Sequence, residues 1–276
     1  TSTGAYLLGV MPPELMKTLD IEFPVLRRDP HYFLPTTDNR YLLFGSDNAA
    51  MKQQFTTFFS DADWKANEAM QAEIAQLRED VGPTWLMDPL TIEQTADKYV
   101  RPALRQTFID LVRLPVRDYI ERWGFKSDLL KAMYAVTDGF SGLYGTWDTP
   151  GTGHNFLCHN MCRLPGSDGT WMVIKGGMGT VSGTLAQKAI EAGATIEANA
   201  GVASIIVEGG VAKGVRLKDG REVKANVVLC NADPFTMRDL IGDDNLPEDY
   251  KARLDGYVKP GSTFKAVTLS AGLSLG

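Results

Sequence analysis

Residues 171–232 read WMVIKGGMGTVSGTLAQKAIEAGATIEANAGVASIIVEGGVAKGVRLKDGREVKANVVLCNA, and this stretch decides the fold. A strand-like run at 171–175 stops at Gly176-Gly177. Apolar residues then recur at the i, i+4 spacing of one helix face, at Val181, Leu185 and Ala189. Gly193 can adopt the left-handed conformation that ends helices, and a second short strand is expected at 194–198. The sequence therefore predicts a strand that passes through glycines into a helix.

A small antiparallel meander is predicted directly after this unit. Apolar residues alternate with others in three runs, at 202–207, 211–217 and 222–223. Turns containing glycine separate the runs, at 208–210 and 219–220. The last run, 227–230, is continuously apolar, as expected of a strand buried on both faces of a sheet. Together these segments predict a mixed α/β fold.

Four motifs carry a resemblance to a known family. They are YLLGVMPPEL at 6–15, PGTGHNF at 150–156, GGMG at 176–179, and xGVxSIxVEGGVAxGVxLxDGxEVxAxVVLxNADP ending at Pro234. With these motifs the chain resembles the phytoene desaturase and carotenoid isomerase family of flavoprotein oxidoreductases. The resemblance implies part of a two-domain, FAD-dependent, amine-oxidase-like fold. Residues 1–170 and 235–276 would then belong to a helical and mixed substrate domain, and 171–234 to a partial Rossmann-like FAD domain with a β-meander.

The resemblance also implies positions for FAD. The backbone of Val202 would face the adenine edge, Asn231-Ala232 would end the strand that returns beneath the cofactor, and Gly176, Gly177 and Met178 would join them as cofactor-binding positions. The family's diphosphate-binding G-x-G-x-x-G fingerprint lies upstream of Thr1, and the chain ends at AGLSLG within a strand-like region. We therefore expect an internal fragment that holds part of an FAD site.

A second interpretation is an NAD(P) site within this chain. Gly177, Gly179 and Gly183 form a G-x-G-x-x-x-G pattern between a strand and a helix, where backbone N–H groups can bind a pyrophosphate. Glu197 then stands near the end of the next strand, where a ribose-binding acid is expected. The spacing departs from G-x-G-x-x-G, so close packing of the helix on a sheet is the favoured explanation of these glycines. A non-catalytic binding or scaffold protein with a degenerate flavoprotein fold is the third interpretation.

Three further groups of residues have ordinary explanations. His154, Cys158, His159 and Cys162 are zinc-ligand types, but their spacing fits no standard paired-ligand pattern, and we predict no metal. The glycines and aromatics at 139–147 suit a packed loop better than a flat ligand. The carboxylate pairs Asp61/Asp63 and Asp243/Asp244 suit a helix start and a solvated loop.

Composition excludes several classes of protein. A net charge of −6, without a basic stripe, argues against nucleic acid as a partner. Three cysteines are too few for a disulfide framework and indicate a reducing compartment, so we expect the cytoplasm or the mitochondrial matrix. No apolar run approaches the roughly 20 residues that cross a bilayer. The family resemblance leaves peripheral membrane contact as an expectation.

The first half of the chain is predicted to be mainly helical. Pro13 opens a short helix, a hairpin is expected around 36–40, and an amphipathic helix starts at Asp61. By resemblance, the helical region at 55–137 covers the flavin and forms the cavity for an apolar, polyene or lipid-like substrate. In such chemistry the flavin takes or returns a hydride and needs no protein nucleophile. We therefore predict an FAD-dependent oxidoreductase and name no catalytic residue.

Overall fold

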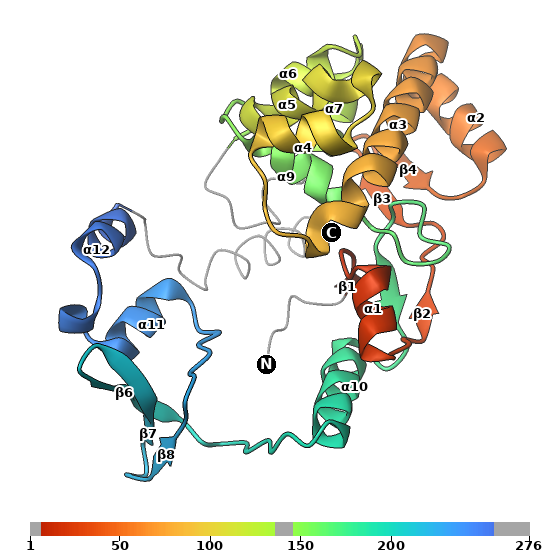
Figure 1. Cartoon of the computed structure of the whole chain (residues 1–276). Helices are drawn as coiled ribbons and strands as arrows, with labels where there is room; N and C mark the ends of the chain where they lie inside the picture. The colour runs from red at the N-terminus through yellow and green to blue at the C-terminus, as the bar shows by residue number, and fades with distance from the viewer. Residues whose placement is uncertain (1–6, 136–145, 257–276) are drawn as a thin grey trace. The chain divides into compact units, whose positions relative to one another are not determined.

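The computed structural model describes residues 7–135 and 146–256 (Figure 1). The described residues divide into two compact units, one of residues 7–135 and 146–191 and the other of residues 192–256. The domain boundaries implied by the resemblance concern substrate and cofactor domains, and they stay predictions. The mixed α/β class is confirmed by the helices, small sheets and hairpin described below.

Helices dominate the first unit. The helix α3 (Asp61–Val81) has the predicted apolar face, and its fully buried residues there are Met70, Ile74 and Leu77. The helix starts at Asp61 as predicted, and Ser60 is its N-cap, because Ser60 Oγ accepts a hydrogen bond from the Asp63 N–H at 3.0 Å. The other elements of this helical layer are α2 (Asn48–Phe58), η1 (Gly82–Leu86), α4 (Ile92–Tyr99), η2 (Pro102–Leu104), α5 (Arg105–Arg113), α6 (Val116–Glu121), α7 (Asp128–Ala135) and α9 (Thr152–His159).

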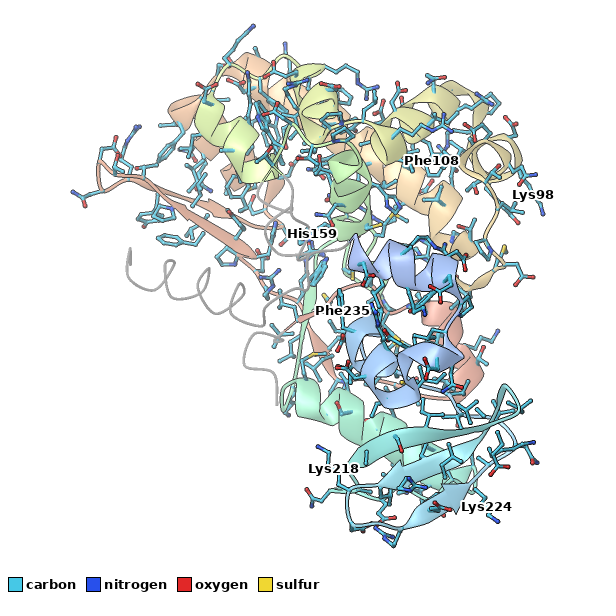
Figure 2. The ribbon with its side chains drawn as sticks, turned by 90° about the vertical axis from the view of Figure 1, so that its left-hand side faces the viewer. Lys98, Phe108, His159, Lys218, Lys224 and Phe235 are labelled. Carbon is cyan, nitrogen blue, oxygen red and sulfur yellow. The ribbon has the colours of Figure 1, made fainter. Side chains whose placement is uncertain are left out.

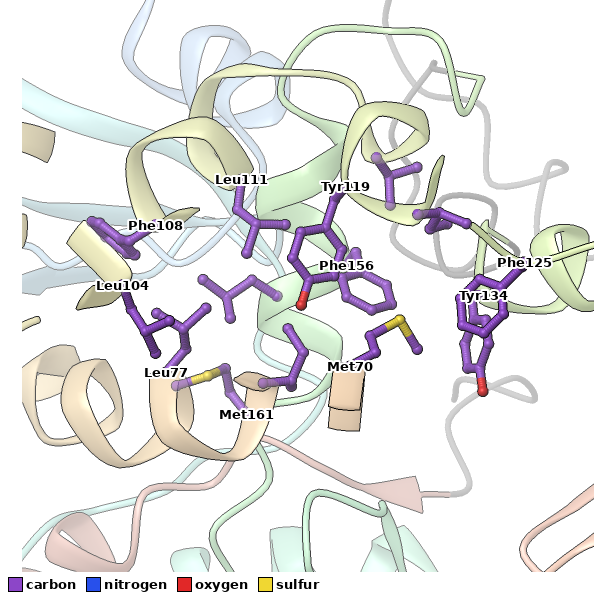
Figure 3. Packing of buried hydrophobic residues seen from close by; sticks show 14 of the residues in the cluster. Met70, Leu77, Leu104, Phe108, Leu111, Tyr119, Phe125, Tyr134, Phe156 and Met161 are labelled. Carbon is purple, nitrogen blue, oxygen red and sulfur yellow. The ribbon is translucent and has the colours of Figure 1, made fainter. Parts of the chain in front are cut away.

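The core of this layer is formed by side chains from several helices (Figure 3). Phe108 of α5, Tyr119 of α6 and Phe156 of α9 pack above α3. Gly153 lets α9 lie close to α5, because a Cβ at this position would stand 2.5 Å from the Leu111 carbonyl oxygen. Burying each large apolar side chain contributes about 1.5–3 kcal/mol. The layer therefore holds its helices in fixed positions by packing.

A three-stranded antiparallel sheet lies in the same unit. Its order is β1 (Leu7–Leu8), β5 (Met172–Ile174), β2 (Val25–Leu26), so β5 is the central strand. The helices α1 (Pro13–Leu19) and α10 (Met178–Glu191) belong to the same region. A second apolar cluster joins them, with Leu8, Phe23, Ile174 and Val181 among its buried members. Both helices begin where the sequence predicts.

A β-hairpin completes the first unit. The strands β3 (Tyr32–Pro35) and β4 (Tyr41–Phe44) pair antiparallel around the predicted loop at 36–40. Gln54 of α2 holds β4 in place, since its side-chain amide accepts from the Leu43 N–H and donates to the Leu43 carbonyl oxygen. The hairpin is thereby attached to the helical layer.

The second unit is built on the predicted meander. The strands β6 (Val202–Glu208), β7 (Val211–Leu217) and β8 (Glu222–Lys224) pair antiparallel in chain order. Gly209 and Gly210 both have positive φ in the first turn, a conformation that favours glycine. Lys218 and Lys224 project from this sheet into solvent (Figure 2). The helices α11 (Pro234–Ile241) and α12 (Glu248–Asp255), with the short η3 (Asp243–Asn245), complete the unit.

Two expected strands are absent from the described residues. Residues 194–198 are exposed and irregular, and 227–230 form no strand, with Val227 71% and Leu229 92% exposed. An apolar run becomes a buried strand only where neighbouring strands satisfy its backbone and cover its faces. The described residues contain no parallel sheet that could do so. Both predictions are therefore wrong for this structure.

Candidate functional site

An apolar cavity lies among the helices of the first unit. Its volume is 440 Å³, within the usual range for small-molecule sites. The walls come from the end of α3, from η1 and the loop after it, and from α4, α5 and α9. The lining residues are Val81, Thr84, Trp85, Met87, Asp88, Pro89, Leu90, Ile92, Thr95, Tyr99, Phe108, Val112, His154, Leu157, Cys158 and Met161.

Local sequence explains how these walls form. Phe108 and Val112 are four residues apart on α5, so both point from the same face of that helix. Leu157 lies on α9, and Met161 follows shortly after the end of that helix. The third wall, α4, begins with a capping box in which the side chains of Thr91 and Gln94 bond each other's backbone N–H groups. The cavity is therefore held by defined helix faces.

Hydroxyl groups in the lining are already hydrogen-bonded within the protein. The Tyr99 hydroxyl donates to Met87 Sδ at 3.2 Å, and Thr95 Oγ1 donates to the Thr91 carbonyl oxygen at 2.9 Å. Such groups gain little from a polar ligand, whereas the apolar walls gain from every methylene that they bury. The lining thus suits an apolar ligand.

One pair of reactive side chains borders the cavity. His154 Nε2 lies 3.5 Å from Cys158 Sγ, one turn further along α9. Burial lowers the pKa of His154 and raises the pKa of Cys158. Both shifts favour an uncharged imidazole beside an uncharged thiol near pH 7, so the pair adds no net charge to the apolar wall.

The other two members of the predicted His/Cys group lie elsewhere. His159, labelled in Figure 2, stacks on Trp171 with ring centroids 4.8 Å apart. Cys162 is buried in the second apolar cluster beside β5. Within residues 7–135 and 146–256, no three His, Cys, Asp or Glu side chains are grouped so that they could hold a metal ion.

The glycine segment before α10 has the conformation that its sequence suggests. Gly176 and Gly177 have φ of +87° and +78°, and Met178 begins the helix and packs on the second apolar cluster. A Cβ on Gly177 would meet no atom within 4 Å, so its backbone is open to a close approach. This geometry fits the predicted contact of Gly176, Gly177 and Met178 with a cofactor, which stays a prediction.

The remaining predicted cofactor positions lie in the second unit. Val202 opens β6, the outer strand of the meander, where the neighbouring Gly201 carbonyl accepts from the Lys218 N–H at 2.8 Å. Backbone groups of consecutive strand residues point to opposite edges, so the Val202 backbone faces away from β7. In this orientation the backbone N–H and C=O groups of Val202 can meet the edge of a ligand. Asn231 and Ala232 lie in exposed coil before α11, and their cofactor role stays a prediction.

The structure gives no support to a separate NAD(P) site. Both neighbours of β5 run antiparallel to it, and the expected strand at 194–198 is missing, so no βαβ unit surrounds α10. Glu197 is paired with Arg221 at 2.6 Å in the second unit. The glycines of α10 are therefore outside the context in which a dinucleotide fingerprint acts.

The acidic pairs and the described part of the aromatic segment have structural roles in a helix start, an exposed ion pair and the core. Asp61 and Asp63 lie in the first turn of α3, as expected, but Asp63 is buried and accepts from the Lys126 N–H at 2.8 Å. Asp243 is paired with Arg238 in an exposed segment. Of the aromatic segment, 139–145 lie outside the described residues, and Trp147 packs on the main core.

The family resemblance predicts a substrate cavity in the helical region at 55–137, but the sequence did not identify the residues that line it. The sequence feature that indicates this lining is the helix break at Gly82-Pro83, which is followed by large apolar residues and Pro89. Trp85, Leu86, Met87 and Leu90 are each 38–51% exposed there. Apolar residues that recur in a loop, where polar ones are usual, indicate a site of contact.

Comparisons with known proteins agree with this fold. Residues 28–267 match the model of a family described as flavin-containing amine oxidoreductase. Pyridine nucleotide-disulfide oxidoreductase domain-containing protein 2 of Mus musculus is 29% identical over 92% of this chain and 48% of its own length. Chloroplastic prolycopene isomerase of Daucus carota is 38% identical over 32% of this chain and 14% of its own. The chain thus spans about half the length of the mouse protein.

Solved structures show the same fold at low sequence identity. An oxidoreductase from Methanosarcina mazei superposes with a TM-score of 0.56 at 15% identity, over 92% of this chain and 53% of that one. A protein from Pyrococcus furiosus gives 0.53 at 15% identity, over 89% and 49%. The family model spans most of the sequence and both units, and the chain belongs to the flavin-containing amine oxidoreductase family.

Proposed function

We propose that this chain forms the substrate cavity and part of the FAD site of an oxidoreductase that acts on an apolar, polyene or lipid-like substrate. The observation that carries the proposal is the 440 Å³ cavity, whose walls are mainly apolar and whose Tyr99 and Thr95 hydroxyls are already hydrogen-bonded. Relatives named as a prolycopene isomerase and a diapophytoene desaturase support the same substrate class.

The residues of the cavity bind and orient the substrate. Phe108, Val112 and Leu157 present apolar surface from two helices, and this surface excludes water from a bound chain. His154 and Cys158 offer uncharged polar atoms at one wall. When FAD is bound, it supplies the hydride acceptor. The chemistry then needs no charged side chain in the cavity.

Each unit of the chain, taken by itself, contains predicted cofactor positions. The open backbone at Gly177 and the outward-facing backbone at Val202 would each accept a close ligand edge. Gly176 and Met178 adjoin Gly177 in sequence, and Asn231 and Ala232 follow the meander that Val202 opens. We assign FAD, and no nicotinamide nucleotide, to these positions.

Access to the cavity follows from the loop after η1. Trp85, Met87 and Leu90 line the cavity and, with Leu86, expose apolar surface along which an apolar substrate can enter. Among the described residues, no helix is both long and apolar enough to cross a membrane. We propose peripheral contact with a membrane surface as the source of the substrate, in the cytoplasm or the mitochondrial matrix.

The binding half of this proposal is tested with cis-parinaric acid, a fluorescent polyene fatty acid. We expect saturable fluorescence enhancement with the full chain. Val112→Phe should weaken binding at least about tenfold, since the larger ring projects into the cavity and overlaps the bound chain. Val223→Phe, on the exposed strand β8, is the matched control and should bind normally. Equal binding by both variants would place the probe elsewhere and contradict the assignment.

The redox half is tested by the visible absorbance of the purified full-length protein. Flavin bands that bleach when an apolar polyene is added without oxygen would support an oxidoreductase. Probe binding without any flavin would contradict the redox half and favour a binding protein.

A further inference from the structure

Cys158 differs from the other two cysteines in its surroundings. It is half-buried, it lines the apolar cavity, and its Sγ lies 3.5 Å from His154 Nε2. Cys162 is 1% exposed within the second apolar cluster, and Cys230 is exposed in the second unit. Cys158 alone combines a ligand-sized space with a neighbouring base, and the other two serve as internal controls.

The geometry at this sulfur allows a base-assisted reaction, although burial makes the thiol less acidic and the imidazole less basic than free groups. Burial raises the pKa of the Cys158 thiol, so little thiolate is present near pH 7. Burial also lowers the pKa of His154, so its imidazole is neutral and able to accept a proton. A thiol that loses its proton to an adjacent imidazole as it attacks is an activated nucleophile.

The cavity walls select the partner of this nucleophile. An alkyl chain would lie against Val112, Leu157 and the other apolar residues of the lining, and the electrophilic carbon would face the sulfur. We propose that Cys158 is a modification site that captures alkyl α,β-unsaturated aldehydes inside the cavity. This inference rests on the proposed function, because it uses the same cavity for an apolar ligand.

The reaction balances without any further reagent. Cys158 Sγ forms a bond to the β-carbon of the aldehyde as the carbon–carbon double bond is consumed. The thiol proton passes to His154 Nε2 and from there to the α-carbon. No group leaves, and neither an oxidant nor a reductant is required. The adduct fills the cavity, so it blocks the apolar substrate until the addition reverses.

The length of the alkyl chain decides which cysteine reacts. Each methylene buried in the cavity improves binding by roughly fourfold, from about 0.8 kcal/mol per CH₂. A long aldehyde is therefore concentrated at Cys158. A short one gains almost nothing from the cavity, and it reacts faster at the exposed Cys230.

The test labels the purified full chain with trans-2-nonenal or with propenal, fixes the adducts by borohydride reduction, and measures each cysteine by peptide mass spectrometry. We expect nonenal to modify Cys158 more than about tenfold faster than Cys230, and propenal to show the reverse preference. His154→Gln should slow modification at Cys158 and leave Cys230 unchanged.

Matched variants separate this inference from the proposed function. Val112→Phe should protect Cys158 from nonenal, whereas Val223→Phe should not. If cis-parinaric acid binds with Val112 dependence but nonenal shows no preference for Cys158, the covalent inference is overturned and the substrate cavity stands. If cis-parinaric acid does not bind and nonenal also shows no preference, both are overturned.

Discussion

Single residues of this chain are constrained by backbone geometry as much as by packing. Gly214 in β7 has φ of +150°, a value that residues with a Cβ rarely adopt. A Cβ at this position would also overlap the Val223 carbonyl oxygen on β8. Glycine is therefore required where the two strands approach.

The first prediction follows from this contact. Gly214→Ala should lower the free energy of unfolding of the second unit by more than about 1 kcal/mol, through strain and the displaced strand. Urea unfolding followed by circular dichroism measures the change. Gly179→Ala is the control, because this helical glycine has open space around it and alanine should stabilise α10 by about 0.5–1 kcal/mol. A Gly214→Ala protein as stable as wild type would contradict the assigned pairing.

At the scale of elements, helix α4 depends on its first turn. Thr91 and Gln94 close the capping box, and Ile92, Thr95 and Tyr99 of the same helix line the cavity. The helix has only eight residues, too few to be stable without capping and packing. Its N-terminus therefore links local sequence to the shape of the site.

We expect Thr91→Ala to cost about 0.5–2 kcal/mol of stability, because an N–H of the first turn loses its acceptor. The same variant should weaken cis-parinaric acid binding, since one cavity wall frays. Thr91→Ser keeps the hydroxyl and should restore both properties. Chemical denaturation and the fluorescence titration provide the two measurements. A loss of binding with Thr91→Ser equal to that with Thr91→Ala would rule out the cap as its cause.

Elements defined by local periodicity could be predicted from the sequence. The buried face of α3, the hairpin around 36–40 and the meander of the second unit form as expected, because their partners are adjacent in sequence. The segments 194–198 and 227–230 could not be predicted, because a strand requires distant partners. The lining of the cavity also escaped prediction, since its walls come from residues up to 80 positions apart, Val81 to Met161.

As the pH falls, protonation of histidines lowers the stability of the whole molecule before protonation of carboxylates does. Burial, with the nearby charge of Arg28, lowers the pKa of both His31 and His159 below the ordinary value of about 6.5. In the unfolded chain these two imidazoles bind protons as the pH falls through that value, whereas in the folded state they bind fewer protons at the same pH. Stability is therefore complete above about pH 6.5 and declines below it.

The Asp80 carboxyl acts in a lower pH window. Its hydrogen bond from Arg101 holds its pKa below the ordinary value, so its contribution is lost only as the pH falls below about 4. A decline between pH 7.5 and 5.5 thus reports the histidines.

We predict that the urea midpoint falls between pH 7.5 and 5.5, and that the double variant His31→Gln/His159→Gln has a flatter dependence. Asp80→Asn should leave the slope in this window unchanged. The measurement is a set of denaturation curves at matched ionic strength. A double variant with the wild-type slope would show that other groups control stability in this range.

The exposed run at 227–230 has a consequence for handling the protein. Val227, Val228 and Leu229 combine high β-propensity with no charge, the composition of segments that nucleate intermolecular cross-β assembly. Lys224 precedes the run, and Asp233-Pro234 follows it, a charge and a proline that act as gatekeepers against fibril growth. The solubility of this chain therefore depends on residues that also build its fold, since Lys224 pairs in β8 and Asp233 caps α11.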